Sequence, residues 1–143
     1  MIYLDTSALV KLVLQETATD LAWSLLDEQS AATSRITWAE ARAALARRER
    51  EEPGNGELWQ QTLLHLTDQW RRLRLIEVTQ PVVTLAGDYA VAFALRGFDA
   101  VQLASAHALQ AALPGSWTFL SFDRRLNRGA KLLGLQMPEW VPQ

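Results

Sequence analysis

Short apolar runs of the kind that form buried strands alternate with longer stretches of helical periodicity along this chain. Four such runs occur, at residues 2–4, 31–34, 75–78 and 117–122. Parallel strands need a long crossover between them, usually a helix, and a sheet built in this way is covered by helices on both faces. We therefore predict an α/β fold with three layers, α/β/α, around a mostly parallel central sheet of four to five strands.

The helical stretches between these runs are bounded by residues that begin or end helices. Gly97 and Pro114 are expected to end the helices that precede them. The strongest turn signal, residues 53–56, is followed directly by another helical stretch, so we interpret it as a tight connection between two helices. One domain over residues 1–143 is predicted. Helices are expected after Asp5, from Thr17, after residue 56, and over about residues 37–51, 82–95, 99–113 and 123–133.

The composition narrows the chemistry that this chain can perform. It contains no cysteine and two histidines, which excludes disulfides, thiolate metal sites and cysteine nucleophiles. Any metal site is therefore expected to be rich in oxygen ligands. No apolar run approaches the ~20 residues that cross a bilayer, and no basic segment precedes an apolar stretch at the start. We expect a soluble, cytoplasmic protein.

The formal net charge of −2 gives no bulk attraction to nucleic acid. The arginines are clustered, however, in three segments. We interpret the first cluster as the solvated face of a helix, balanced by neighbouring glutamates. For the third cluster, a solvated face and a phosphate-binding patch both remain open. The clusters are Arg42, Arg47, Arg48 and Arg50, then Arg71, Arg72 and Arg74, and last Arg124, Arg125 and Arg128.

Four acidic residues lie near points where predicted elements turn into helices. Asp5 ends the first strand candidate, Asp123 ends the last, and Glu40 lies early in the helix after the second. Ligand sites in open parallel sheets form at the carboxyl ends of the strands, so these three acids are expected near one rim. Asp99 begins a helix that follows another helix, and this argument does not fix its position.

Carboxylates that converge at one rim have two readings. They supply the oxygen ligands that Mg²⁺ prefers, and nucleases often pair two such ions about 3.5–4 Å apart. Alternatively, each acid caps its own helix, because Asp5, Asp99 and Asp123 all stand at helix starts. Glu40 has a specific version of this alternative, since Thr37 to Glu40 matches a capping box. The residues alone leave both readings open.

Four segments match, in order and spacing, the motifs of a known nuclease family. They are residues 2–12, 37–45, 96–106 and 120–126. With these motifs the chain resembles a PIN domain of the VapC toxin type over almost its entire length. The resemblance implies an endoribonuclease dependent on Mg²⁺ or Mn²⁺, usually the toxin half of a type II toxin–antitoxin pair. By position it implies that Asp5, Glu40, Asp99 and Asp123 are the catalytic and metal-binding acids, supported by Thr6 and Ser7.

The resemblance also implies partners and one local departure. The implied partners are an RNA substrate such as tRNA or another structured RNA, a small cognate antitoxin, and a second copy of the chain. Gln102 stands where many relatives carry a histidine, a change expected to affect the surroundings of the site more than its metal. The expected reaction is in-line attack of a deprotonated water on an RNA phosphodiester.

Two other functions remain as alternatives. Another Mg²⁺-dependent phosphohydrolase, similar to the haloacid-dehalogenase phosphatases, would carry a second aspartate two positions after the first, where this chain has Ser7. A catalytically silent module that binds a protein partner would not need all four acids. No role is assigned to His65 and His107, which are interpreted as surface or hydrogen-bonded core residues. The same core-packing interpretation covers most of Trp38, Trp59, Trp70 and Trp117.

Overall fold

The computed structural model describes residues 1–14, 19–113 and 115–143. The predicted helix start at Thr17 and helix stop at Pro114 lie outside these residues. None of the described helices is both long and apolar enough to span a membrane. In chain order the elements are β1 (Ile2–Leu4), α1 (Thr6–Leu14), α2 (Thr19–Glu28), β2 (Ala31–Ser34), α3 (Thr37–Glu51), α4 (Gly56–Arg72), β3 (Arg74–Ile76), α5 (Gln80–Ala92), α6 (Gly97–Ala112), β4 (Thr118–Leu120) and α7 (Arg124–Leu132).

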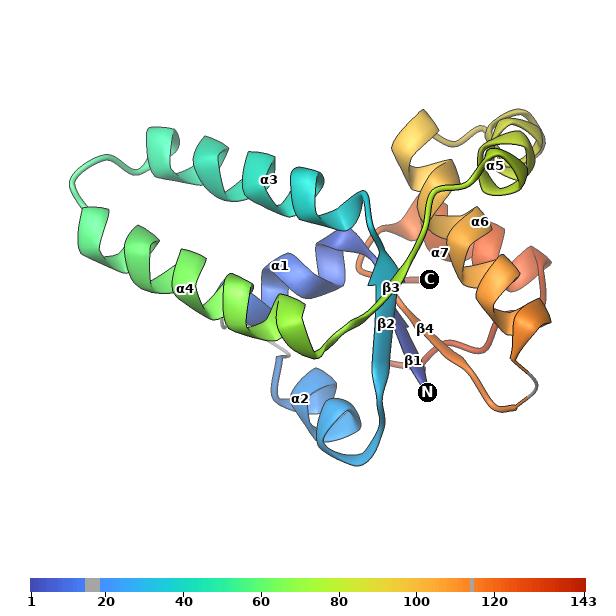
Figure 1. Ribbon diagram of the computed structural model, residues 1–143, viewed down its shortest axis with the longest axis horizontal. Helices are drawn as coiled ribbons and strands as arrows, with labels where there is room; N and C mark the ends of the chain where they lie inside the picture. Colours follow the sequence, from blue (N-terminus) through green and yellow to red (C-terminus); the bar gives the residue numbers. More distant parts are fainter. Residues whose placement is uncertain (15–18, 114) are drawn as a thin grey trace.

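The strands form one parallel sheet in the order β3-β2-β1-β4. In the register of this sheet, Tyr3 of β1 is paired with Ala32 of β2 and with Phe119 of β4. Figure 1 shows α1 to α4 on one side of the sheet and α5 to α7 on the other. The predicted three-layer α/β/α architecture with a parallel sheet of four strands is therefore confirmed.

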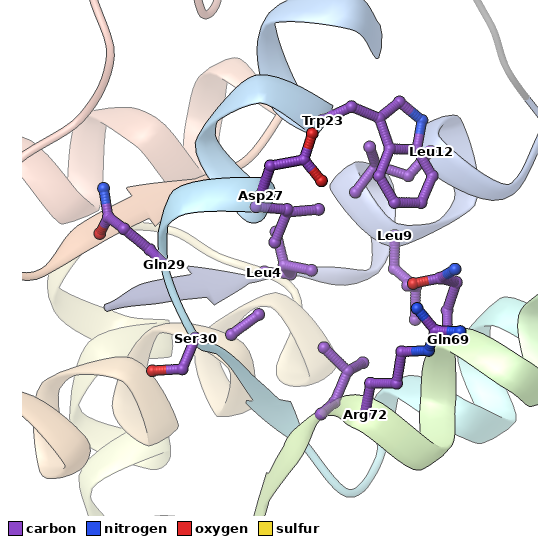
Figure 2. A pocket seen from close by; sticks show the side chains of 12 residues that line it. Leu4, Leu9, Leu12, Trp23, Asp27, Gln29, Ser30, Gln69 and Arg72 are labelled. Atoms are coloured by element: carbon purple, nitrogen blue, oxygen red, sulfur yellow. The ribbon is translucent and has the colours of Figure 1, made fainter.

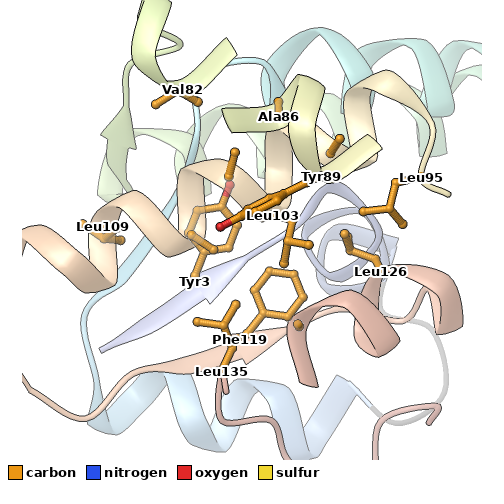
Figure 3. Packing of buried hydrophobic residues seen from close by; sticks show 14 of the residues in the cluster. Tyr3, Val82, Ala86, Tyr89, Leu95, Leu103, Leu109, Phe119, Leu126 and Leu135 are labelled. Atoms are coloured by element: carbon orange, nitrogen blue, oxygen red, sulfur yellow. The ribbon is translucent and has the colours of Figure 1, made fainter. Parts of the chain in front are cut away.

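The two faces of the sheet carry separate hydrophobic cores, because alternate residues of a strand point to opposite faces. Tyr3 and Phe119 stack at 5.7 Å between ring centroids and face α5, α6 and α7 (Figure 3). Ile2, Leu4 and Leu120 face the opposite way, into the core formed with α1 and α4. The central strand β1 is thus fixed from both sides, and so is the residue that follows it.

The connection from α5 to α6 differs from the prediction that Gly97 ends the first helix. Ala94 adopts the left-handed conformation at φ 51°, and the amide of Leu95 donates to the carbonyl of Ala90. This is the chain reversal that glycine usually provides at the end of a helix. Because an alanine takes that place, α5 ends at Ala92 and Gly97 begins α6.

Other predicted boundaries are correct or shift by a few residues. The strands β1 and β2 and the helix α3 have the predicted bounds, and residues 53–56 connect α3 to α4 as expected. The strand β3 begins and ends earlier than predicted, and β4 is shorter at both ends. The predicted residues outside the ladder include the apolar Val78, Trp117 and Phe122, so composition alone did not mark where the pairing stops.

The tryptophans and histidines have the structural roles that the sequence suggested. Trp59 and Trp117 are buried, and Trp38 packs against Trp70 between α3 and α4 at 5.3 Å. The Nδ1 atom of His65 lies 3.3 Å from the carbonyl oxygen of Val13, and its ring stacks on Trp23. His107 is hydrogen-bonded to the hydroxyl of Tyr89.

Candidate active site

Two hollows of different character open at opposite ends of the sheet. The smaller, about 170 Å³, lies near the amino ends of β2 and β3 (Figure 2). Apolar residues of α1 and α2 line it together with Gln69 and Arg72 of α4, and Asp27 is the one carboxylate among its described lining residues. The larger, about 780 Å³, lies at the carboxyl ends of β1 and β4. We call this larger hollow the acid pocket, because its lining includes Asp5, Glu40, Asp99 and Asp123.

Asp5 is the most buried of the four acids, with a relative exposure of 3%. The hydroxyl of Ser7 donates to both carboxylate oxygens at 2.7 and 2.9 Å, and the hydroxyl of Ser121 donates to Oδ2 at 2.8 Å. The amide of Ala8 donates to Oδ1 at 2.8 Å, so the predicted helix cap is present as well. Burial raises the pKa of Asp5 to about 6, although these hydrogen bonds act in the opposite direction.

The raised pKa of Asp5 predicts how stability depends on pH in the absence of metal. The unfolded chain loses this proton near pH 3.8, whereas the folded protein keeps it until about pH 6. The contribution is therefore fully present below pH 3.8 and is lost as pH rises through 6. We expect the free energy of unfolding to fall by about 3 kcal/mol over this window.

Urea unfolding in the presence of chelator, at pH values from 3.5 to 7.5, measures this effect. Other carboxylates also titrate there, so the difference between wild type and Asp5→Asn isolates Asp5. The free energy of unfolding of the variant should rise relative to that of the wild type as pH rises, and the difference should then become constant. Parallel stability curves for the two proteins would contradict the assignment.

Glu40 does not form the capping box that was its alternative interpretation. Residue Ile36 occupies the N-cap of α3 and makes no side-chain cap. The Oε2 atom of Glu40 instead accepts from the hydroxyl of Thr6 at 2.6 Å and from Nε2 of Gln102 at 2.7 Å. The Thr37 hydroxyl lies 2.8 Å from that of Thr33. The carboxylate of Glu40 is therefore turned into the acid pocket and away from its own helix amides.

Gln102 connects three elements beneath the acid pocket. Its side chain is buried, its Oε1 accepts from the hydroxyl of Tyr3 at 2.8 Å, and its Nε2 lies 2.7–2.9 Å from Thr6, Thr37 and Glu40. An amide nitrogen has two hydrogens, so these three acceptors share them. The sequence drew attention to Gln102 as a departure from the motif but did not reveal this network, because its partners lie 62 to 99 residues away.

Asp99 is half-buried and caps no helix, since the N-cap of α6 is Arg96. Its carboxylate forms no hydrogen bond with the described residues. Burial raises the pKa of Asp99, and the negative charges of Asp123 and Glu40 raise it further, while Arg96 and Arg125 partly offset them. The capping interpretation is therefore wrong for Asp99. The charges of two of the other acids act on its carboxylate.

Asp123 has the capping role that its position suggested. Its Oδ1 accepts from the amides of Arg125 at 2.7 Å and Leu126 at 3.0 Å, which caps α7. Its Oδ2 accepts no hydrogen bond from the part of the chain described here. One oxygen of Asp123 therefore stabilises the fold, while the other remains available to a ligand in the acid pocket.

The spacing of these acids does not form a closed metal site, but their chemistry suits a metal ion. Among the described residues, no group of three acidic or histidine side chains is close enough to hold one ion between them. Their donor atoms are all carboxylate oxygens, and burial together with the charges of Asp123 and Glu40 raises the pKa of Asp99. Mg²⁺ keeps several of its waters and needs only one or two carboxylates, so the donor set fits this ion without a closed protein shell.

Cationic side chains line the same pocket beside the acids. The first arginine cluster is largely exposed, as predicted, and Arg47 forms an exposed pair with Glu51 one turn along the helix. The same face nevertheless borders the acid pocket, which the sequence interpretation missed. Helical periodicity was the available signal, because Arg47 follows Glu40 by two turns. The cations in the lining are Lys11, Arg47, Arg48, Arg50 and Arg96.

Known proteins resemble this chain in both sequence and fold. The family model described as "PIN domain" matches residues 2–132. Ribonuclease VapC49 of Mycobacterium tuberculosis is 41% identical over 142 residues, covering 96% of this chain and 94% of the relative. VapBC2 of Rickettsia felis, bound to a DNA fragment from its promoter, matches with a TM-score of 0.67 at 17% identity, covering 98% of this chain and 99% of that one.

A further structure shares the architecture at low sequence identity. It is a toxin–antitoxin complex from Klebsiella pneumoniae, with a TM-score of 0.58, 18% identity, and coverage of 86% of this chain and 87% of that one. At such identities the two structural matches establish the fold alone. The family model and the VapC relative extend over nearly the whole chain, so the chain belongs to the PIN-domain family, among the VapC-type members that its four motifs predicted.

Proposed function

We propose that this protein is an endoribonuclease, the toxin of a type II toxin–antitoxin pair, and that it cleaves RNA phosphodiesters in the acid pocket. One observation carries the proposal: four acids line one hollow in a chain that is 41% identical to a protein named as a ribonuclease. A catalytically silent binding module would need Asp5 only as the cap of α1, which asparagine would form without the cost of ionising a buried carboxyl.

The four acids would hold Mg²⁺ or Mn²⁺. When bound, such an ion lowers the pKa of a coordinated water and offsets negative charge on the phosphate. Ser7 and Ser121 fix the orientation of Asp5, and Thr6 and Gln102 fix that of Glu40. The carboxylate of Asp99 keeps its freedom to bind a ligand.

The cationic side chains of the lining complement the acids. Lys11 lies over the ring of Phe122 at 5.0 Å, and Arg96 lies close enough to Asp99 to lower its pKa. Both line the acid pocket, where they would attract an RNA backbone that the acids alone would repel. This arrangement offers RNA a local positive rim on a chain of net negative charge.

The proposal includes three partners and a compartment. A structured RNA such as tRNA is the substrate, a small antitoxin inhibits the enzyme, and two copies form a homodimer in the cytoplasm. The antitoxin is supported by the fold shared with a structure described as a toxin–antitoxin complex. The RNA substrate is supported by the name of the relative as a ribonuclease.

Incubation of the purified protein with total bacterial RNA tests the proposal. With Mg²⁺ or Mn²⁺ we expect new RNA ends at a few defined positions, mapped by sequencing, and none in the presence of chelator. An intact RNA pool under all metal conditions would favour the catalytically silent alternative. Release of inorganic phosphate from small phosphate esters, with intact RNA, would favour a phosphohydrolase.

Gln102→Leu tests whether the buried network supports the site. The substitution leaves the hydroxyl of Tyr3 without its acceptor and removes one donor from Glu40. We expect the free energy of unfolding to fall by about 1–3 kcal/mol, since a buried polar group loses its partner. RNA cleavage should fall more than tenfold.

Tyr3→Phe is the matched control for this prediction. It removes the hydroxyl that Gln102 accepts from, but leaves both donors to Glu40 in place. We therefore expect a stability loss with nearly normal cleavage. Equal losses of cleavage in the two variants, measured at a temperature where both are folded, would show that Gln102 acts only through stability.

A further inference from the structure

A third hollow, of about 360 Å³, adjoins the acid pocket. Four of the five residues that line it, Glu40, Arg96, Phe98 and Asp99, also line the acid pocket, and Gly97 completes it. A Cβ added at Gly97 would meet no atom within 4 Å. The two hollows therefore share most of their lining, and a group bound in the one of about 360 Å³ lies beside two of the four acids.

Phe98 presents an aromatic ring to both hollows. Its side chain is 60% exposed and belongs to neither hydrophobic core. The other phenylalanine of the acid pocket, Phe122, differs, because Trp140 packs against it at 6.1 Å and the ammonium of Lys11 lies over its ring. No described aromatic side chain stacks on Phe98, and its high exposure leaves the ring accessible to a ligand.

Arg96 places a cation beside this ring. It is exposed, lines both hollows, and forms no ion pair with the described residues. A guanidinium binds phosphate through paired donors and also stacks on planar groups. The hollow thus combines one aromatic ring and one guanidinium at the edge of the acid cluster.

The backbone around these two residues is anchored on both sides. Leu95 and Ala100 are buried in the core beneath α5 and α6. The left-handed turn at Ala94 directs the chain from α5 into this segment. Phe98 is therefore held at the hollow by the fold, so a ligand would not bear the entropy cost of ordering this segment.

We propose that Phe98 and Arg96 form a nucleotide subsite, in which Phe98 stacks on an unpaired base next to the scissile phosphodiester and Arg96 binds the adjoining phosphate. This proposal rests on the proposed ribonuclease function. An RNA strand continues on both sides of the bond that is cut, so a flanking nucleotide necessarily lies beside the acids. Aromatic rings and guanidinium planes are the groups that take up unpaired RNA bases.

The subsite has a consequence for substrate choice. A base that stacks on Phe98 must leave its pairing partner, so cleavage is directed to loops and other unpaired segments. Stacking accepts every base, so the subsite favours an unpaired base over a missing one more strongly than one base over another. Loss of one such contact corresponds to a decrease of about 5- to 150-fold in kcat/KM.

Abasic substitution in a defined RNA tests the subsite. The probes are labelled RNA hairpins with unpaired loops, cut once by the wild type, and a series in which each loop base in turn is removed. At one position flanking the cut, removal of the base should lower the kcat/KM of the wild type by about 5- to 150-fold. Phe98→Leu should show that loss already on the intact RNA and be insensitive to the missing base.

Two further variants serve as controls. Phe98→Trp retains an aromatic face and should restore both the rate and the sensitivity to the abasic position. Val91→Ala removes another exposed apolar side chain, which lines neither hollow, and should behave as wild type. The main effect of Phe98→Leu should be on KM, because stacking binds the substrate before the chemical step.

Three results would overturn the proposal, and they are distinguishable. Phe98→Leu that cleaves as the wild type does, or that keeps the abasic sensitivity, would show that no base stacks there. A change only in oligomeric state or antitoxin binding would assign Phe98 to a protein interface. Absence of cleavage by the wild type itself would refute the ribonuclease function, and the subsite with it.

Discussion

Asp5→Asn is expected to reduce RNA cleavage by about 10²–10³-fold or more, the effect of removing one strong electrostatic contact to a transition state. The same substitution should stabilise the metal-free protein at neutral pH. Asp5 is 3% exposed, and burial raises its pKa to about 6, so ionisation at pH 7 opposes folding. A neutral asparagine of the same shape avoids that cost.

The opposite signs of these two effects make the prediction specific. If Asp5 only capped α1, the change to asparagine would alter neither stability nor activity, because asparagine caps a helix as well as aspartate does. Cleavage rates and urea unfolding of wild type and Asp5→Asn, both at pH 7, measure the pair of effects. Asp20→Asn, an exposed acid in the first turn of α2, is the control and should change neither. Undiminished cleavage by Asp5→Asn would contradict the proposed role.

Asp99→Asn should also reduce cleavage by about 10²–10³-fold, but with no loss of stability. The Asp99 carboxylate makes no hydrogen bond within the described chain, and it lies in the field of two other acids. Its neutralisation relieves repulsion between like charges and removes a carboxylate that would coordinate the metal in the acid pocket. Loss of activity without loss of stability distinguishes a ligand-binding acid from a structural one.

Asp123 provides the matched comparison for this prediction. The substitution Asp123→Asn keeps the cap of α7, because asparagine is as good an N-cap as aspartate. It should therefore reduce cleavage without reducing stability. The substitution Asp123→Ala removes the cap and should also cost about 1 kcal/mol of stability. If Asp99→Asn destabilised the protein as much as Asp123→Ala, the contrast between the two acids would be wrong.

The parts of the fold that the sequence predicted depend on local signals. The apolar run of β1, the small residues of β2 and the periodicity of α3 defined those elements to the residue. The α5–α6 turn could not be predicted in this way. Alanine disfavours the left-handed conformation, and Ala94 adopts it because the surrounding packing holds Leu95 in the core.

The candidate site was likewise predicted only in part from the sequence. Chain order placed Asp5 and Asp123 at one rim, because each ends a strand and β1 pairs with β4. The position of Asp99 came from the family resemblance. The capping-box alternative for Glu40 is wrong, because it rests on a local pattern, while Thr6 and Gln102 approach from distant segments. Nonlocal hydrogen bonds leave no periodic trace in a single sequence.

Ser7 shows why one alternative function is not supported. It occupies the position where a haloacid-dehalogenase-like phosphatase would carry its second aspartate. Here its hydroxyl donates to Asp5 and accepts from the amide of Phe122 at 2.8 Å, which connects the ends of β1 and β4. Ser7 therefore positions the first acid and joins two strands, a role that a carboxylate at this place would disrupt by repelling Asp5.

Calorimetric titration of Mn²⁺ into the purified protein tests the central claim, that the acid pocket is a metal centre. The wild type should bind Mn²⁺, Asp99→Asn should bind it at least tenfold more weakly, and Asp88→Asn, an exposed acid on α5, should bind as the wild type does. Binding in the wild type should also release protons, because the pKa values of Asp5 and Asp99 are raised. No binding by the wild type, or equal binding by Asp99→Asn, would contradict the account.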